Sequence, residues 1–186
     1  MRKALCIIAV ILLAAAIAYS TNNIVVMRTN VGDITIELFN DRAPVTVQNF
    51  LRYVDAKFYD GTLFHRVIGN FMIQGGGFIP GLTPKYNFQP IVNEASNGLQ
   101  NKRGTIAIAR TNDVNSATSQ FFINVMDNPS LDFRDPSPQG FGYCVFGRVI
   151  QGMDVVDRIR SVPTKTIGFY QDVPVRDVVI LSVIRK

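Results

Sequence analysis

The stretch FHRVIGNFMIQGGG, residues 64–77, contains the chain's single histidine, an arginine, a glutamine and three consecutive glycines among large apolar residues. It contains no serine or cysteine that could act as a nucleophile and no carboxylate that could act as a base. Arginine is a permanently charged hydrogen-bond donor, and the apolar residues supply a binding surface. The residue types in this stretch leave open which chemistry needs an arginine among apolar residues but no nucleophile.

His65 and Arg66 are neighbours in sequence, but strand alternation separates them. The two predicted faces carry Phe64, Arg66 and Ile68 on one side and Leu63, His65 and Val67 on the other. We therefore expect His65 to be a structural histidine near the core. A zinc site would need further histidine or cysteine ligands, and we predict no metal and no other cofactor.

The triplet Gly75 to Gly77 lacks the GxxxxGK[ST] spacing of a phosphate-binding loop. These glycines are expected to permit a bend or a close approach of the backbone. A second cluster lies in TSQFFINV, residues 118–125, where alternation places Gln120 with Phe122 on one face. One of the two aromatic residues can then enter the core while the other lines a surface, and alternation by itself does not say which.

The chain begins with Met1-Arg2-Lys3, and an uncharged apolar run, residues 4–18, ends in Ala16-Ile17-Ala18. A basic start, a short apolar run and an A-x-A site are typical of a secretory signal peptide. A membrane-spanning helix needs about 20 apolar residues, so an uncleaved anchor is the less favoured alternative. We predict a cleavable signal peptide at 1–18, no membrane insertion after cleavage, and a destination in the periplasm, with secretion as the other option.

No repeat or linker interrupts the rest of the chain, so we predict a single domain over residues 19–186. Removal of the signal peptide leaves 17 basic and 14 acidic residues, a formal charge of +3, without a cluster of lysine and arginine. Nucleic-acid binding is therefore not indicated. Cys6 leaves with the signal peptide, and the remaining Cys144 has no partner for an internal disulfide. We expect Cys144 to be a small buried residue rather than a nucleophile.

The apolar spacing predicts a mainly β protein. Strands are expected at residues 23–29, 33–39, 62–68, 71–75, 104–110, 121–125, 143–150 and 175–186. Helical spacing occurs at 43–58, with Val47, Phe50, Leu51 and Val54 on one face, and at 153–161, with Met153, Val156 and Ile159 on one face. Residues 78–103 are expected to form a long loop. Many short strands with two helices favour a closed antiparallel barrel, which leaves no exposed sheet edge.

Long motifs in the chain resemble those of a known family. They are FHRVIGNFMIQGGGF (64–78), NEASNGLQNKRGTIAIAR (93–110), SATSQFFINV (116–125) and GYCVFGRVIQGMDVVDRI (142–159). Over residues 24–183 the chain resembles the cyclophilins, the peptidyl-prolyl cis-trans isomerases. SVPT (161–164), YQDVPV (170–175) and VVILS (178–182) are similar to the exported bacterial branch. The resemblance implies an eight-stranded barrel capped by two helices, and isomerisation of X-Pro bonds in exported proteins, assisting their folding.

The resemblance also implies roles for individual residues. Arg66 matches the catalytic arginine, and Gln74 matches the residue that holds Arg66 or the substrate carbonyl. The proline-binding side chains would be Phe71, Met72, Phe122 and Leu131. Further substrate contacts would come from Gln120 beside Gln74, from the backbone of Ala109 and Arg110 next to the residue before proline, and from Tyr143, while His65 would have a supporting role.

Three departures from the family pattern change what we expect. Gly69-Asn70 replaces the usual Pro-Gly, which predicts a looser turn before Phe71. Ser130 stands where the family has a tryptophan or another large residue, so cyclosporin binding is expected to be weak. Tyr143 stands where many eukaryotic members have histidine, as it does in bacterial relatives. The segment LDFRDPSPQGFGY, residues 131–143, is also lengthened beside Ser130 and Leu131.

Two other functions stay open at this point. One is a prolyl-peptide binding module or chaperone whose isomerase activity is incidental. The other is a hydrolase that uses Cys144 and His65, for which the sequence identifies neither an orienting partner nor an oxyanion hole. The partners expected from the leading hypothesis are proline-containing polypeptides, bound by a monomer.

Overall fold

The computed structural model describes residues 23–186. The strands of this part are β1 (Ile24–Thr29), β2 (Gly32–Leu38), β3 (Thr62–Ile68), β4 (Met72–Gly75), β5 (Phe78–Ile79), β6 (Thr83–Pro84), β7 (Thr105–Ile108), β8 (Phe121–Asn124), β9 (Val145–Gln151), β10 (Thr164–Ile167), β11 (Tyr170–Pro174) and β12 (Val179–Arg185). The helices are α2 (Pro44–Asp55) and α3 (Met153–Arg160), and the short 3-10 turns are η1 (Ala95–Asn97) and η2 (Pro129–Leu131). The predicted signal peptide lies outside the described residues.

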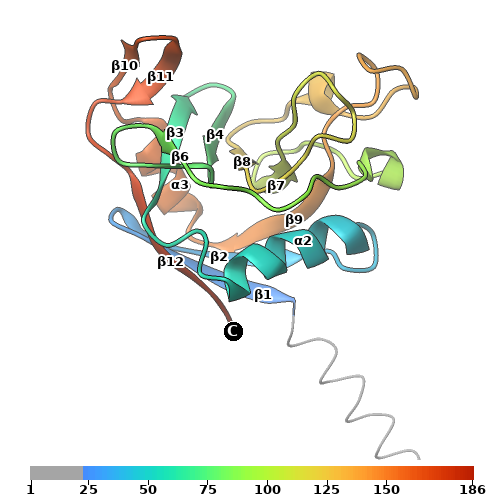
Figure 1. The fold of residues 1–186 in the computed structure, drawn as a ribbon, viewed down its shortest axis with the longest axis horizontal. Coiled ribbons are helices and arrows are strands. Elements are labelled where there is room, and N and C mark those ends of the chain that lie inside the picture. The colour runs from blue at the N-terminus through green and yellow to red at the C-terminus, as the bar shows by residue number, and fades with distance from the viewer. Residues whose placement is uncertain (1–22) are drawn as a thin grey trace, which may run out of the picture.

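Eight antiparallel strands close into a barrel in the order β1-β12-β3-β4-β8-β7-β9-β2 (Figure 1). The predicted mainly β, eight-stranded antiparallel barrel with two helices is confirmed. Strand β1 lies four places from β8 around the ring, so these two strands face each other across the barrel. The strands β3, β4, β8 and β7 are consecutive neighbours, which brings their outward side chains together on one side.

The core fills the barrel interior and includes one face of each helix. In α2, Pro44 occupies the first turn, where its missing N–H costs no helical hydrogen bond. The α2 side chains that join the core include those predicted from the helical spacing, Val47, Phe50, Leu51 and Val54, and also Tyr53. In α3, Val156 and Ile159 are buried as predicted, Met153 is partly buried, and Val155 is buried as well. Both helices are therefore held to the barrel by apolar burial.

One prediction about β3 is wrong. We expected Phe64 and Arg66 to share a face, but Phe64 pairs with Gly75 and Arg66 pairs with Gln74. Two residues of β3 thus lie opposite one residue of β4, which is a β-bulge and reverses the alternation. Phe64 joins the core together with Val67, whereas Arg66 faces outward beside Gln74.

Outside the barrel, a hairpin that the sequence did not predict is formed by β10 and β11. It packs alongside β3 and projects beside β3 and β4 in Figure 1. The expected loop at 78–103 is confirmed, apart from the two-residue strands β5 and β6 and the turn η1. Within residues 23–186, no helix is long and apolar enough to span a membrane.

Candidate active site

Nine of the residues implied by the resemblance line one cavity of about 240 Å³ on the outer side of the barrel. Its lining residues are Arg66, Phe71, Met72, Gln74, Ala109, Arg110, Phe122, Leu131 and Tyr143. Strands β3, β4 and β8 and the residues after β7 supply the floor, and η2 with Tyr143 supplies a wall. The closed sheet therefore gathers residues that are far apart in sequence.

The floor of this cavity is apolar. Met72 and Phe122 are almost fully buried and form a small cluster separate from the main core. Phe71, Leu131 and Tyr143 pack against that cluster, and the ring of Phe122 meets that of Tyr143 edge to face at 5.6 Å between centroids. The expected alternation in β8 is confirmed, because its other aromatic, Phe121, is buried in the main core. We call this apolar part of the cavity the cup, and its size suits a compact apolar ring.

Arg66 is the charged group at the edge of the cup, and its Nε lies 3.7 Å from Oδ2 of Asp172 in β11. The sequence analysis did not assign Asp172 a role; the only signal was its place in YQDVPV. Asp172 has a φ of +59°, in the left-handed region that aspartate tolerates better than most residues. Both side chains are partly exposed, so the pair orients the guanidinium more than it stabilises the fold.

Gln74 lies next to Arg66 across the β3–β4 ladder. Its Nε2 donates a hydrogen bond of 2.9 Å to Oε1 of Gln120, so the two glutamines hold each other, and in the described structure Gln74 does not bond Arg66. Both glutamines line a smaller adjoining cavity of about 130 Å³ together with Ala109 and Arg110. The polar edge of the site is thus already arranged before a substrate binds.

The three glycines after Gln74 serve close packing, as predicted. A Cβ on Gly77 would lie 2.6 Å from Cγ of Gln120, and one on Gly76 would lie 2.8 Å from the ring of Phe121. Gly76 also has a φ of +82°, which side-chain-bearing residues rarely adopt. The glycines therefore let the chain bend closely around the site.

Arg110 anchors the loop at residues 131–143. Its Nε donates to the carbonyl of Gly142 at 2.9 Å, and its Nη2 donates to the carbonyl of Pro138 at 3.0 Å. The guanidinium also lies 5.0 Å from the ring centroid of Tyr143. Ser130 is exposed at the rim beside Leu131. The side chain of Arg110 thus holds one wall of the cavity.

Three buried asparagines connect the segments that carry the cup, and the sequence analysis missed all three. Asn128 donates from Nδ2 to the carbonyl of Phe71 at 2.8 Å and to Oδ1 of Asn124 at 2.7 Å. Asn101 donates to the carbonyl of Leu131 at 3.1 Å, and Asn124 donates to Asn101 at 3.2 Å. Removing one member leaves buried polar partners unsatisfied.

Replacing Asn124 with alanine should lower the free energy of unfolding by about 2–3 kcal/mol, because at least two buried groups lose their partner. It should also raise KM for the prolyl peptide that the resemblance implies as substrate, since Phe71 and Leu131 lose a shared support. Urea denaturation and steady-state kinetics measure the two effects. The exposed Asn112 is the matched control, and equal stability of Asn124→Ala and Asn112→Ala would contradict the assignment.

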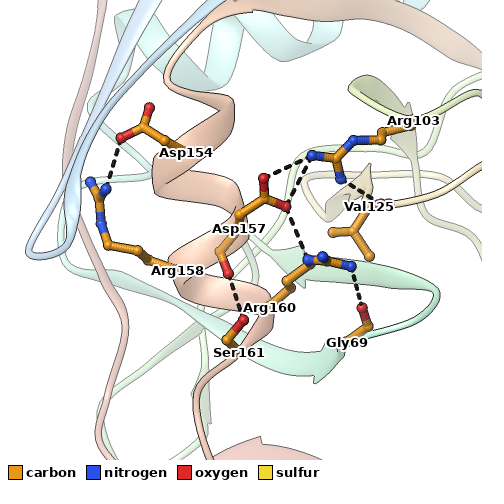
Figure 2. A network of polar contacts seen from close by, with 8 residues as sticks. All are labelled: Gly69, Arg103, Val125, Asp154, Asp157, Arg158, Arg160 and Ser161. Carbon is orange, nitrogen blue, oxygen red and sulfur yellow. Dashed lines mark hydrogen bonds and ion pairs between the residues drawn. The ribbon is translucent and has the colours of Figure 1, made fainter.

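The turn before Phe71 is tied to α3 (Figure 2). Nη1 of Arg160 donates to the carbonyl of Gly69 at 3.1 Å, and Nε of Arg160 forms an ion pair of 2.9 Å with Asp157. Asp157 also accepts a hydrogen bond of 2.8 Å from Arg103. The pKa of Asp157 is therefore lowered, first through this hydrogen bond and then through the positive charges of Arg103 and Arg160.

The sequence predicts a looser turn from Gly69-Asn70. In the structure Gly69 permits close packing of this turn against α3, since a Cβ on Gly69 would lie 2.8 Å from the carbonyl oxygen of Arg160.

His65 precedes Arg66 in β3 and does not line the cup. Its ring packs against that of Phe78 at 4.7 Å between centroids, and its Nδ1 makes no hydrogen bond to any residue in the described range 23–186. Burial, together with the nearby charge of Arg66, lowers the pKa of His65 from 6.5 to about 4. The imidazole is therefore neutral at pH 7.

The depressed pKa of His65 predicts an acid-dependent loss of stability. As the pH falls below 6.5, the unfolded chain binds a proton on His65 that the folded chain does not bind until about pH 4. Stability is therefore lost as the pH falls through this window, by about 2 kcal/mol between pH 7.5 and pH 5. Urea denaturation at the two pH values should show that His65→Gln loses about 2 kcal/mol less than the wild type. An identical pH dependence in the two proteins would contradict this prediction.

Cys144 is buried in the core, with its Sγ 3.5 Å from Oγ1 of Thr46. Burial raises the pKa of its thiol to about 12, so the group is not a thiolate at pH 7. We expect an alkylating reagent to leave the folded protein unmodified and active, and to react after denaturation, as mass spectrometry would show. Rapid alkylation of the native protein with loss of activity would revive the hydrolase hypothesis.

Comparison with known proteins agrees with this geometry. The family model described as cyclophilin type peptidyl-prolyl cis-trans isomerase matches residues 24–185. Peptidyl-prolyl cis-trans isomerase B of Escherichia coli strain K12 is 58% identical over 159 residues, which cover 86% of this chain and 97% of that protein. A peptidyl-prolyl cis-trans isomerase of Acinetobacter baylyi is 57% identical over 162 residues, 87% of this chain and 85% of that protein.

A solved structure shares the architecture as well. The crystal structure of a cyclophilin type peptidyl-prolyl cis-trans isomerase from Cryptosporidium parvum, in the presence of the dipeptide Ala-Pro, matches with a TM-score of 0.75 and 28% identity, covering 88% of this chain and 98% of that chain. The barrel, the family model and the identities agree over nearly all of the described residues. The chain therefore belongs to the cyclophilin-type peptidyl-prolyl cis-trans isomerases.

Proposed function

We propose that the 240 Å³ cavity binds the proline ring of a polypeptide substrate and that Arg66 accelerates rotation about the peptide bond before that proline. The observation that carries this proposal is the position of one outward guanidinium at the edge of an apolar cup. The Ala-Pro dipeptide named for the Cryptosporidium parvum structure supports a proline-containing ligand. The reaction breaks no bond, which is consistent with the absence of a nucleophile from residues 64–77.

The physical basis is the loss of amide resonance during rotation. A planar peptide bond resists rotation with a barrier of about 18–20 kcal/mol, because its C–N bond has partial double-bond character. In the twisted transition state the prolyl nitrogen regains its lone pair and can accept a hydrogen bond. A donor such as Arg66, directed at that nitrogen, binds the twisted form more tightly than either planar form, and this difference lowers the barrier.

The other cavity residues would position the substrate. Phe71, Met72, Phe122 and Leu131 would hold the proline ring. Because the N–H of Ala109 already donates to the carbonyl of Gln120 at 2.8 Å, we assign the backbone of Arg110 to pair with the residue that precedes proline. Gln74, held by Gln120, would direct its amide toward the substrate carbonyl. Tyr143 would close the wall of the cup beside Phe122.

The test is catalysis of cis-trans exchange by residues 19–186. Exchange spectroscopy on an Ala-Pro peptide and the refolding of a proline-limited protein should both be faster with substoichiometric protein. Binding of the peptide without faster exchange would instead favour the alternative, a prolyl-peptide binding module or chaperone. Protection of the refolding protein only at stoichiometric amounts would favour the same alternative.

We further propose that residues 1–18 are removed during export and that the domain assists folding in the periplasm. The basic start, the short apolar run and the A-x-A site support this proposal. Expression of the full chain in a Gram-negative bacterium should yield periplasmic protein that begins at Tyr19. Full-length protein retained in the membrane fraction would support the uncleaved anchor, and protein in the medium would support secretion.

Two smaller proposals concern partners. We expect a monomer in solution, which size-exclusion chromatography with light scattering would test. We expect weak inhibition by cyclosporin, because Ser130 is small and exposed at the rim where the family has a large residue. Substituting Ser130 with tryptophan should then strengthen the inhibition.

A further inference from the structure

The carboxylate of Asp157 on α3 lies between two guanidinium groups (Figure 2). Nη2 of Arg103 donates to both carboxylate oxygens, with a distance of 3.0 Å to Oδ1 and 2.8 Å to Oδ2. Nε of Arg160 is buried and makes no hydrogen bond within residues 23–186, but it forms an ion pair of 2.9 Å with Oδ1 of Asp157. One carboxylate thus holds two arginines from different parts of the chain.

Each arginine also donates to a main-chain carbonyl. Nη1 of Arg160 donates to the carbonyl of Gly69 at 3.1 Å, and Nη1 of Arg103 donates to the carbonyl of Val125 at 2.7 Å. Gly69 lies in the turn between β3 and β4, and Val125 directly follows β8. The two arginines therefore connect α3 to the segments that carry the cup.

Both carbonyls belong to residues that hold Phe71, which lines the cup. Gly69 precedes Phe71 by two residues in the same turn. Across the β4–β8 ladder, the N–H of Val125 donates to the carbonyl of Phe71 at 3.2 Å. Phe71 is thus supported along the chain through Gly69 and across the sheet through Val125, and the two supports meet at Asp157.

The turn before Phe71 needs support from outside because its own residues bury little. Gly69 and Asn70 are both exposed, and a glycine backbone has more conformational freedom to lose than that of any other residue. Glycine is nevertheless required there, since a Cβ on Gly69 would lie 2.8 Å from the carbonyl oxygen of Arg160. The contacts with α3 therefore fix the position of this turn.

The negative charge of Asp157 is what holds the two arginines. The hydrogen bond from Arg103 and the positive charges of Arg103 and Arg160 keep the pKa of Asp157 below its ordinary value, so the group is ionised at pH 7. Hydrogen bonds between two charged groups are stronger than those between neutral groups. An asparagine at this position would keep the size of the side chain, but it would lose the charge and one of the two acceptor oxygens.

We propose that Asp157 is a positioning residue of the isomerase, which fixes Phe71 in the cup through Arg103 and Arg160. This inference rests on the proposed binding of the proline ring in the cup. The cup holds the ring in the planar and in the twisted states alike, so a displaced Phe71 weakens the binding of both states equally. The effect of Asp157 therefore appears in KM, whereas that of Arg66 appears in kcat.

Exchange spectroscopy at several concentrations of an Ala-Pro peptide separates KM from kcat for residues 19–186. Asp157→Asn should raise KM about fivefold, within the range of one lost hydrogen bond, and should keep kcat within about twofold of the wild type. Arg160→Met keeps the length of the side chain but removes its donors. Because the support through Arg103 remains in that variant, its KM should rise only about twofold.

Asp154→Asn is the matched control, because it removes the same charge from the same helix. Asp154 forms an ion pair of 2.7 Å with Arg158, and Arg158 donates to the carbonyl of Val31, outside the cup. This variant should keep the wild-type KM. The amide NMR signals of Asn70 and Phe71 should shift in Asp157→Asn and stay in place in Asp154→Asn.

A double variant tests whether Asp157 acts through Phe71. Phe71→Ala removes the ring that Asp157 is proposed to position. Adding Asp157→Asn to Phe71→Ala should therefore raise KM by less than about 1.5-fold more, since two residues that act through one contact are not additive.

Three results would each overturn the positioning role. They are a KM of Asp157→Asn equal to that of Asp154→Asn, a loss confined to kcat, and an undiminished fivefold effect in the Phe71→Ala background. If Asp157→Asn does not fold, Arg160→Met decides the question, because a KM equal to that of the wild type would refute the support through Gly69. Failure of the proposed function looks different: the wild type would then not accelerate exchange, and the signals of Asn70 and Phe71 would still show whether Asp157 positions the turn.

Discussion

Replacing Arg66 with alanine should lower kcat/KM for an Ala-Pro peptide about a hundredfold, as removal of one preorganised transition-state donor commonly does. The bulge in β3 turns this side chain outward beside Gln74, and no other charged donor in the cup is placed to replace it, since Arg110 is bonded to Gly142 and Pro138. Exchange spectroscopy on the peptide measures the effect. Arg66→Lys should lose about tenfold, because lysine keeps the charge but lacks the planar donors of arginine.

Arg28→Ala is the control for this experiment. Arg28 is exposed on β1, across the barrel from β8, and its loss should leave kcat/KM unchanged. The partly exposed pair of Arg66 and Asp172 is worth at most about 1 kcal/mol to the fold, so both variants should unfold near the wild-type urea concentration. A folded Arg66→Ala that keeps kcat/KM within threefold of the wild type would refute the proposed mechanism.

Replacing Phe50 with alanine should lower the free energy of unfolding by about 3–5 kcal/mol, the usual cost of emptying a buried phenylalanine site. Phe50 is fully buried on α2. Its ring centroid lies 5.1 Å from that of Tyr59, 5.9 Å from that of Phe121 and 5.2 Å from that of Phe146. Loss of this ring removes contacts between the helix and β8, β9 and the turn that precedes β3. Urea denaturation at pH 7.5 measures the change.

Two further variants show whether the cost comes from the cavity. Phe50→Leu keeps most of the volume and should cost about 1–1.5 kcal/mol. Val45→Ala, on the exposed side of the same helix, should change stability by less than about 0.5 kcal/mol. If Phe50→Ala costs less than 1.5 kcal/mol, the aromatic cluster is not the main link between α2 and the barrel.

Much of the fold could be predicted because its signals are local. The helical spacing of Val47, Phe50 and Val54 depends only on residues within two turns, and the structure buries these three. The pairing of Gln120 with Phe122 follows in the same way from strand alternation. The β10–β11 hairpin was missed because its residues, Thr164–Ile167 and Tyr170–Pro174, are mostly polar or exposed, so no buried face produces an alternating pattern.

The direction of Arg66 shows where local rules stop. Alternation predicts that it shares a face with Phe64, but the bulge sends Phe64 into the core and Arg66 outward. The bulge arises from the pairing of β3 with β4, where one extra residue must be accommodated. That pairing belongs to two strands together, so the sequence of β3 by itself does not reveal it.

By itself, the sequence determined the family, the barrel and the kind of chemistry, because these depend on residue types and spacings that are read along the chain. The role expected of Arg66 came from the resemblance of its motif to the cyclophilins, and the absence of a nucleophile from residues 64–77 is consistent with that role. Only the tertiary structure decided that Asp172 pairs with Arg66 and that Phe169 and Tyr170 stand beside it. These residues lie more than a hundred positions after Arg66, and closure of the barrel around one core is what brings them together.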